Sequence, residues 1–225
     1  MTTQPLAPGS TDRTRVRRIP ERAVADVAAL HAVLDAGLVA HVAVSDDGGQ
    51  PFVIPVAYAR REDEVVFHGS TGSRLFRTLA SGQPTCLTVT LLDGLVLARS
   101  AFESSMNYRS AMVLGVARKL EGDDELDALR VITEHLLPGR WAECRQPSAK
   151  ERAATLTLAL RLDECSVKIR ADGPEDIPED VTDPVYSRVW AGHVPLNESF
   201  GTPVPSEESL PDTPVPGYIE KWSRS

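Results

Sequence analysis

The sequence has few cysteines, no surplus of basic residues and no long apolar run, and each shortage removes a class of protein. Its three cysteines, Cys86, Cys144 and Cys165, are far apart and form no CxxC pair, which favours a reducing compartment over a disulfide framework. No apolar run approaches the ~20 residues of a membrane-spanning helix, and no apolar segment follows the arginines near the N-terminus, as a secretion signal requires. We therefore expect a cytoplasmic protein without a membrane partner.

The charge balance and the missing catalytic spacings narrow the function further. A formal net charge of −8 and a pI near 5.2 argue against a nucleic-acid partner, because binding to phosphate backbones needs clustered Lys and Arg. The histidines show no metal-binding spacing, and the chain contains no Gly-x-Ser-x-Gly elbow, Walker loop or Gly-x-Gly-x-x-Gly motif. A structural metal site, serine hydrolysis and the common nucleotide-binding motifs are therefore disfavoured.

The first part of the chain predicts a helix followed by an antiparallel meander. The segment from Pro20 to Gly37 carries helix start and stop signals. Strands are predicted at residues 38–44, 52–58 and 65–68, the first two joined by an Asp-Asp-Gly-Gly turn. Because Pro55 cannot donate to a ladder, we expect an edge, a bulge or an opening of the sheet at that position.

The rest of the chain predicts further strands, two more helices and an extended tail. Helices are predicted at 74–80 and 123–137, the second with Asp123 and Asp124 as N-caps, and strands at 85–92, 111–120 and 155–169, with a turn at Asp93-Gly94. About six strands and three helices predict a mainly β fold, a small antiparallel barrel with peripheral helices. We expect a flexible arm at 1–19, one domain at 20–170, and a Pro-rich extension at 171–225 that wraps the barrel or a partner subunit.

Two polar stretches are candidates for a binding site. Residues 67–74 place hydroxyls, glycines and Arg74 between a strand end and a helix start, which suits an anion such as phosphate. The alternative for this stretch is an N-cap loop with a surface arginine. Residues 104–110 precede an apolar strand, and they either line a pocket or form an ordinary polar connection.

Four stretches together resemble a known family. Gln50–Pro55, His68–Arg74, Thr88–Ser100 and Ser105–Ser110 are similar, in the same order, to the flavin-nucleotide-binding branch of the pyridoxamine 5'-phosphate oxidase superfamily, which is related to nitroimidazole-resistance proteins. The resemblance implies an FMN-binding split β-barrel, with peripheral helices, that forms a homodimer and holds FMN between its subunits. The anion site predicted from the residues coincides with the family's phosphate loop.

The resemblance also implies roles for particular residues. It assigns the backbone of Val53–Pro55 to the flavin edge and the side chains of the serine-rich loop to the phosphate, although His68 could equally be a strand-end residue bonded to backbone. The implied cofactor-binding residues are Val53, Ile54, Pro55, His68, Ser70, Ser73, Arg74, Ser105, Asn107, Tyr108 and Arg109, and the implied catalytic residues are His68, Tyr108 and Arg109.

The implied function is that of an FMN-dependent oxidoreductase that acts on a small molecule. True pyridoxamine phosphate oxidases carry a C-terminal Trp and an Arg-x-His-type segment that holds the vitamin phosphate, whereas this tail is Pro-rich, so vitamin B6 is not the expected substrate. One alternative is a flavin-binding protein without turnover. Another is a split barrel that uses haem or a deazaflavin, with His41, His68 and His193 as the candidate haem ligands.

Overall fold

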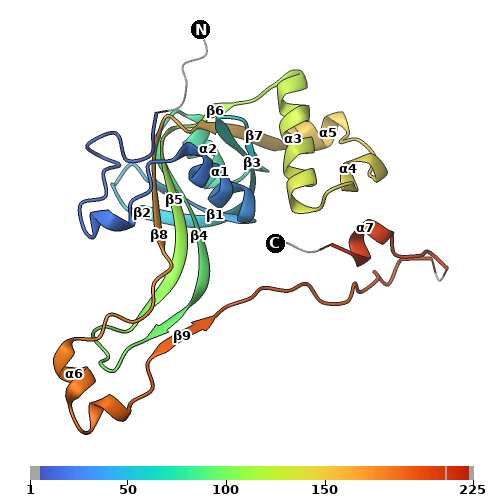
Figure 1. The fold of residues 1–225 in the computed structure, drawn as a ribbon. Coiled ribbons are helices and arrows are strands. Elements are labelled where there is room, and N and C mark those ends of the chain that lie inside the picture. The colour runs from blue at the N-terminus through green and yellow to red at the C-terminus, as the bar shows by residue number, and fades with distance from the viewer. Residues whose placement is uncertain (1–5, 211, 223–225) are drawn as a thin grey trace. The chain divides into compact units, whose positions relative to one another are not determined.

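The computed structural model describes residues 6–210 and 212–222, and it is mainly β-sheet with short helices, as predicted (Figure 1). Residues 1–5 of the predicted arm, and residues 211 and 223–225 of the predicted extension, lie outside the described residues. The chain divides into two compact units: unit 1 comprises Met1–Gly37, Thr88–Val113 and Asp163–Asn197, and unit 2 comprises Leu38–Leu87, Leu114–Leu162 and Glu198–Ser225. Across the described ranges, no helix is long and apolar enough to cross a membrane.

Unit 2 is built on an antiparallel sheet with the strand order β6-β7-β3-β2-β1. Its strands are β1 (Val39–Ser45), β2 (Pro51–Arg61), β3 (Glu64–Ser70), β6 (Arg118–Lys119) and β7 (Thr155–Arg161). The β1–β2 turn forms as predicted, because the Asp46 carboxylate accepts from the amides of Gly48 at 3.0 Å and Gln50 at 2.9 Å, and Gly49 takes a φ of 79°.

The sheet opens beside Pro55, as expected for a residue without an N–H group. Pro55 pairs with His41 of β1, whereas the pairing of β2 with β3 begins only at Tyr58 and runs to Arg61. The first half of β2 is therefore paired along its β1 edge but not with β3, and its backbone and side chains remain accessible there.

Unit 2 contains the helices α2 (Arg74–Ala80), α3 (Gly122–Leu136), α4 (Arg140–Glu143), α5 (Ala149–Ala153) and α7 (Gly217–Glu220), of which α2, α3 and α5 contact its strands. The α3 helix packs against β2, β3 and β7, where Ala128 and Ile132 meet Ala59, Val66 and Ala159 in a buried apolar cluster (Figure 1). This packing follows from the apolar stripe that the sequence places on one face of α3.

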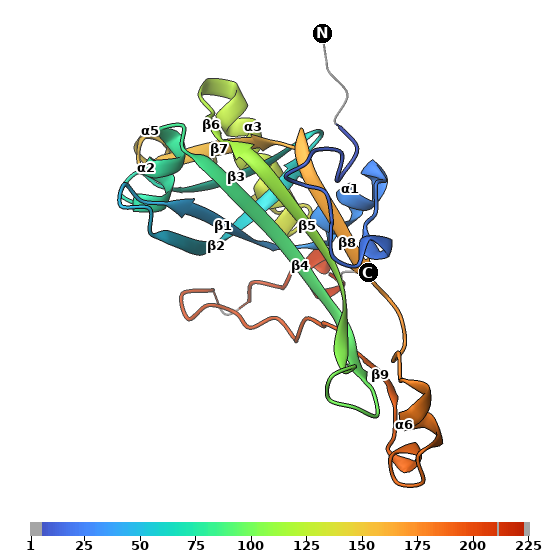
Figure 2. The same ribbon diagram turned by 90° about the vertical axis from the view of Figure 1, so that its left-hand side faces the viewer.

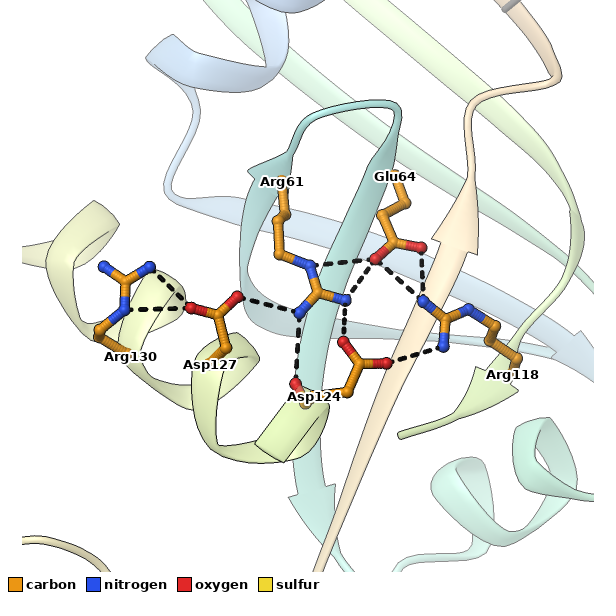
Figure 3. Close-up of polar contacts among 6 residues, drawn as sticks. All are labelled: Arg61, Glu64, Arg118, Asp124, Asp127 and Arg130. Atoms are coloured by element: carbon orange, nitrogen blue, oxygen red, sulfur yellow. Dashed lines mark hydrogen bonds and ion pairs between the residues drawn. The ribbon is translucent and has the colours of Figure 1, made fainter. Parts of the chain in front are cut away.

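A charged network fastens α3 to the β2–β3 hairpin (Figure 3). The Arg61 guanidinium, only 15% exposed, pairs with Glu64, with Asp124 at 2.8 Å and with Asp127 at 3.2 Å. Arg118 of β6 joins the network through Glu64 and Asp124, each at 3.0 Å. The N-cap of α3 is Glu121, so Asp123 and Asp124 lie in the first turn and are not the predicted caps.

Unit 1 contains α1 (Val27–Ala36), β8 (Glu164–Arg170), β9 (Gly192–Pro195), α6 (Pro178–Thr182), the 3₁₀ turns η1 (Pro20–Arg22) and η2 (Tyr186–Arg188), and most of β4 (Pro84–Leu97) and β5 (Ser105–Val116). The strand order is β4-β5-β8, and β9 pairs with β4. Figure 2 shows β4 and β5 as long neighbouring strands, with β9 beside one end of β4.

The helix predicted from Pro20 begins later than expected. Asp26 caps α1, because its carboxylate accepts from the amide of Ala28 at 3.0 Å, so the helix starts at Val27 and ends before Gly37 as predicted. Pro20–Arg22 forms a separate turn, and Ala23 makes a β-bridge with Lys168. A stronger capping residue downstream thus outweighs the proline start signal.

The turn predicted at Asp93-Gly94 is wrong, because β4 continues through both residues. A Cβ at Gly94 would lie 2.6 Å from the carbonyl oxygen of Val194 in β9. The glycine therefore permits a close approach of two backbones and does not reverse the chain.

Two strand boundaries also differ from prediction. The polar residues 105–110, predicted to precede a strand, form the first half of β5. The single strand predicted at 155–169 is two strands, β7 and β8, which are separated at Leu162-Asp163.

Candidate functional site

The loop between β3 and α2 is fixed by its own hydrogen bonds and by the neighbouring backbone. The Ser70 hydroxyl accepts from the Gly72 amide at 3.1 Å, and the Ser70 carbonyl accepts from the Ser73 amide at 2.9 Å. The Thr71 amide donates to the Ala154 carbonyl at 3.0 Å. These bonds hold the serine hydroxyls in one short turn at the end of β3.

A glycine sets the approach of α2 to this loop. A Cβ at Gly69 would lie only 2.2 Å from the Phe76 ring, so Phe76 packs directly on the backbone of β3. The Phe76 ring also contacts the Phe67 ring, with their centroids 6.0 Å apart. Because any side chain at position 69 would displace the Phe76 ring, the glycine allows α2 to pack closely against the end of β3.

Arg74 is the cation of this loop, and the described residues offer it no carboxylate. Its guanidinium lies over the Phe52 ring, 4.3 Å from the centroid, and makes no hydrogen bond or ion pair with residues 6–210 or 212–222. Ser73, the N-cap of α2, makes no side-chain cap hydrogen bond. A guanidinium without a carboxylate partner, in a turn that also contains serine hydroxyls, can hold an anionic oxygen group such as a phosphate.

A cavity of about 320 Å³ adjoins the loop at Thr71. Its charged groups are already paired: Lys119 bonds Glu121 at 2.8 Å, and Arg152 bonds Glu125 at 2.7 Å. This cavity therefore offers room beside the loop but no cation comparable to Arg74.

His68 stands two residues before the serine turn, on β3 opposite Thr157 of β7. Its imidazole keeps an exposed surface, yet the surrounding protein lowers its pKa by desolvation. The ring is therefore held neutral to lower pH than a free histidine, and it can accept a hydrogen bond or bind a metal near neutral pH.

Val53, Ile54 and Pro55, which the resemblance assigns to the flavin edge, are exposed. Val53 is 55% exposed and Ile54 is 42% exposed, although both lie inside β2. This run belongs to the half of β2 that pairs with β1 but not with β3.

The second predicted group lies on β5, in unit 1. Asn107 is buried, and its side-chain oxygen accepts from Nη1 of the buried Arg170 at 2.8 Å. Arg109 forms a bidentate pair with Asp93 of β4, at 2.7 and 3.0 Å, and this bond raises the pKa of Arg109. Ser105 is exposed at the strand start, and Tyr108 is half-buried.

The structure thus brings together one part of the predicted site. His68, Ser70, Ser73 and Arg74 share one strand end and loop in unit 2, whereas Ser105, Asn107, Tyr108 and Arg109 lie in unit 1. The sequence reasoning missed three partners, Phe52, Asp93 and Arg170. Phe52 alone had a local signal, since it is the aromatic residue that follows the hairpin turn.

Fold and loop together define a split β-barrel of the flavin-binding type. The chain belongs to the pyridoxamine 5'-phosphate oxidase family, whose model matches residues 26–169. A search among curated proteins finds no match.

Two solved structures are similar to almost the whole chain. The flavocytochrome Anf3 from Azotobacter vinelandii is 40% identical, with a TM-score of 0.88, and the match covers 98% of this chain and 100% of that one. The FAD and haem binding protein from Mycobacterium smegmatis is also 40% identical, with a TM-score of 0.83, and the match covers 88% and 95% of the two chains.

A more distant structure shares the fold. It comes from Bacteroides thetaiotaomicron, is named for 5-nitroimidazole antibiotic resistance, and is 20% identical with a TM-score of 0.56, over 65% of this chain and 86% of that one. This likeness confirms the predicted relation to the nitroimidazole-resistance proteins at the level of the fold.

Proposed function

We propose that this chain is an oxidoreductase that binds a flavin nucleotide, FMN or FAD, together with haem. The flavin half of the proposal rests on the loop Ser70–Arg74, where an arginine without a carboxylate partner among the described residues follows two serines in one short turn. A flavin phosphate supplies the missing negative charge. Both full-length relatives at 40% identity are named for a flavin and a haem, which favours this pairing over FMN alone.

Each residue group has a defined task in this proposal. Arg74, Ser70 and Ser73 hold the phosphate, and the exposed backbone of Val53–Pro55 meets the flavin edge. Asn107, Tyr108 and Arg109 are proposed to contact flavin or substrate, with Arg109 oriented by Asp93 rather than acting as an unpaired cation. When bound, the flavin supplies hydride or single-electron transfer and the haem exchanges single electrons, so the protein needs no nucleophile of its own.

The haem half has residues that fit it. Haem needs an apolar surface and an accessible axial ligand, most often a neutral imidazole. His41, His68 and His193 are all exposed, and His41 and His68 lie on strands of unit 2.

The proposal includes assembly and location. We propose a homodimer, because the exposed apolar residues of β2 leave surface for a second copy to cover. A cytoplasmic setting is favoured because Cys86, Cys144 and Cys165 form no disulfide with one another or with any other described residue. A flavin-binding protein without turnover is the second candidate, and rapid reoxidation of the reduced flavin by a small molecule separates the two.

The first test is the absorption spectrum of the purified protein, before and after addition of flavin and haemin. A flavin spectrum together with a Soret band supports the proposal, and the mass of the released flavin distinguishes FMN from FAD. A protein that takes up neither group, in a folded state shown by circular dichroism, refutes it.

A further inference from the structure

Two neighbouring polar side chains in unit 2 have no hydrogen-bond partner in the described part of the chain. His68 of β3 stands directly opposite Thr157 of β7 in the strand register. The Thr157 hydroxyl is buried and makes no hydrogen bond with the described residues, and the same residues provide none for the His68 imidazole. A hydroxyl and an imidazole that can bond each other therefore lie side by side.

The register places both side chains on one face of the sheet. Val66 pairs with Ala159 two residues before His68, and both belong to the apolar cluster that α3 covers. Directly opposed residues of an antiparallel pair share a face, and residues two apart in a strand lie on the same side. His68 and Thr157 therefore continue the face beneath α3, and the Cβ atoms of such a pair are about 4.5–5.5 Å apart.

The two side chains differ in their access to solvent. Thr157 is only 1% exposed, and its carbonyl accepts from the amide of the buried Leu120 at 2.9 Å, whereas the His68 imidazole keeps an exposed surface. The hydroxyl is therefore closed off from bulk water, while the imidazole is free to change its rotamer at the surface of the sheet. The imidazole is the partner that the register brings to the hydroxyl.

Packing alone does not explain a threonine at position 157. Valine has a similar branched shape, suits a strand and would pack against the apolar cluster without burying a polar atom. A buried hydroxyl without a hydrogen bond destabilises the fold, because it loses its water and gains no partner. Sequences break local rules of this kind mainly at functional sites. The Thr157 hydroxyl is therefore better explained by a task at His68.

A second threonine on the same face shows the ordinary arrangement. Thr155 stands opposite Ser70, and its hydroxyl donates to the Glu151 carbonyl at 2.8 Å. This hydroxyl is satisfied within the chain and has no need of the imidazole. Thr155 therefore provides a matched control for Thr157.

We propose that Thr157 is a positioning residue for His68: its hydroxyl donates to one nitrogen of the neutral imidazole, so that the ring proton stays on the other nitrogen. A neutral imidazole has one donor and one acceptor nitrogen, and a bond to either of them selects the tautomer. The accepting nitrogen is turned to the buried hydroxyl, so the N–H group is left on the open side of the ring.

The task of this N–H group rests on the proposed function. His68 lies two residues before Ser70, at the start of the loop that is proposed to hold the flavin phosphate. Desolvation lowers the pKa of His68, so the ring is neutral at pH 7 and offers one N–H donor at a fixed place. Such a donor suits an electron-rich oxygen or nitrogen of the flavin or of a substrate bound beside it.

The test observes the His68 ring nitrogens by NMR in the full-length, ¹⁵N-labelled protein. The spectra are recorded at about pH 8.5, where a histidine with an ordinary or lowered pKa is neutral, and His68→Gln assigns the signals. A hydrogen bond of ordinary strength favours one tautomer by about 2- to 12-fold. We expect Thr157→Val to change the tautomer ratio of His68 by such a factor, with a thermal midpoint equal to or above that of the wild type.

Two further variants separate positioning from packing. Thr157→Ser keeps the hydroxyl and should restore the wild-type tautomer ratio. Thr155→Val should leave the His68 signals unchanged, because the hydroxyl that it removes bonds the Glu151 carbonyl. A merely structural role of Thr157 predicts instead that the variants change the thermal midpoint and leave the tautomer ratio as it is.

The outcomes separate this inference from the proposed function. Wild-type His68 signals in a folded Thr157→Val protein overturn the inference, and so does a tautomer ratio that Thr157→Ser does not restore. If Thr157→Val does not fold, Thr157→Ala takes its place under the same criteria. A protein in which the ratio changes as expected, but which takes up neither flavin nor haem, refutes the proposed function and leaves the pairing of Thr157 with His68 standing.

Discussion

Replacing Arg74 by Ala tests the anion-holding loop directly. The guanidinium contacts the Phe52 ring at 4.3 Å and has no carboxylate among the described residues, so the substitution removes a charge that no ion pair within the described chain neutralises. A charge-assisted hydrogen bond contributes about 1.5–3 kcal/mol, and each 1.4 kcal/mol corresponds to about tenfold in affinity. We therefore expect the flavin dissociation constant to rise by about 10- to 150-fold.

The assay is a fluorescence titration of the apoprotein with FMN and with FAD. Arg77→Ala is the matched control, because Arg77 is exposed on the same helix, three residues further on, and should leave flavin affinity unchanged. Arg74→Lys should give an intermediate loss, since lysine keeps the charge but not the planar fork. A folded Arg74→Ala protein with wild-type affinity for both flavins would refute the assignment of the phosphate to this loop.

Three further predictions concern other parts of the chain. Gly94→Ala places a methyl group 2.6 Å from the Val194 carbonyl oxygen, so β9 must shift at a cost of about 1–3 kcal/mol, and the β9 amides should exchange hydrogen faster. Asn107→Ala removes an acceptor from the buried Arg170, which should lower the unfolding free energy measured in urea by about 1–3 kcal/mol. Because desolvation lowers the pKa of His68, the unfolded chain takes up this proton first, so stability should decline as pH falls below the ordinary value of 6.5, towards the folded pKa. His68→Gln should lack that part of the decline in urea titrations over this pH range.

Each of these predictions has a contrary result. Unchanged exchange at β9 in Gly94→Ala would mean that the two backbones do not approach closely. An Asn107→Ala protein of wild-type stability would mean that Arg170 finds another acceptor. An identical pH dependence in His68→Gln would assign the decline to other groups.

Sequence reasoning succeeded where the signals are local. The hairpin of β1 and β2 follows from two Asp and two Gly residues in four positions, and the bonds that Asp46 accepts show why that turn forms. The α2 helix matches its predicted bounds, Arg74–Ala80. The loop before it was found because its hydroxyls, glycines and cation are consecutive in the chain.

Sequence reasoning failed where the deciding partner is distant. A glycine such as Gly94 suits both a turn and a close approach of two backbones. Here it permits a close approach, because the backbone of Val194, one hundred residues later in the chain, packs against it. From the sequence alone, Asn107 is typical of a loop. In the structure its side-chain oxygen accepts a hydrogen bond from Arg170 of β8, which the sequence does not indicate. The polar residues of β5 were predicted to precede the strand, because nothing near them in the sequence shows that Asp93 neutralises Arg109.

The charged network between α3 and the β2–β3 hairpin has a consequence for behaviour on heating. Its six side chains, Arg61, Glu64, Arg118, Asp124, Asp127 and Arg130, carry equal numbers of positive and negative charges (Figure 3). The dehydration penalty of ion pairs falls as temperature rises, while apolar stabilisation per unit area levels off. The junction of α3 with the hairpin should therefore weaken less with heat than the apolar packing beside it, and so remain attached at temperatures where that packing loosens.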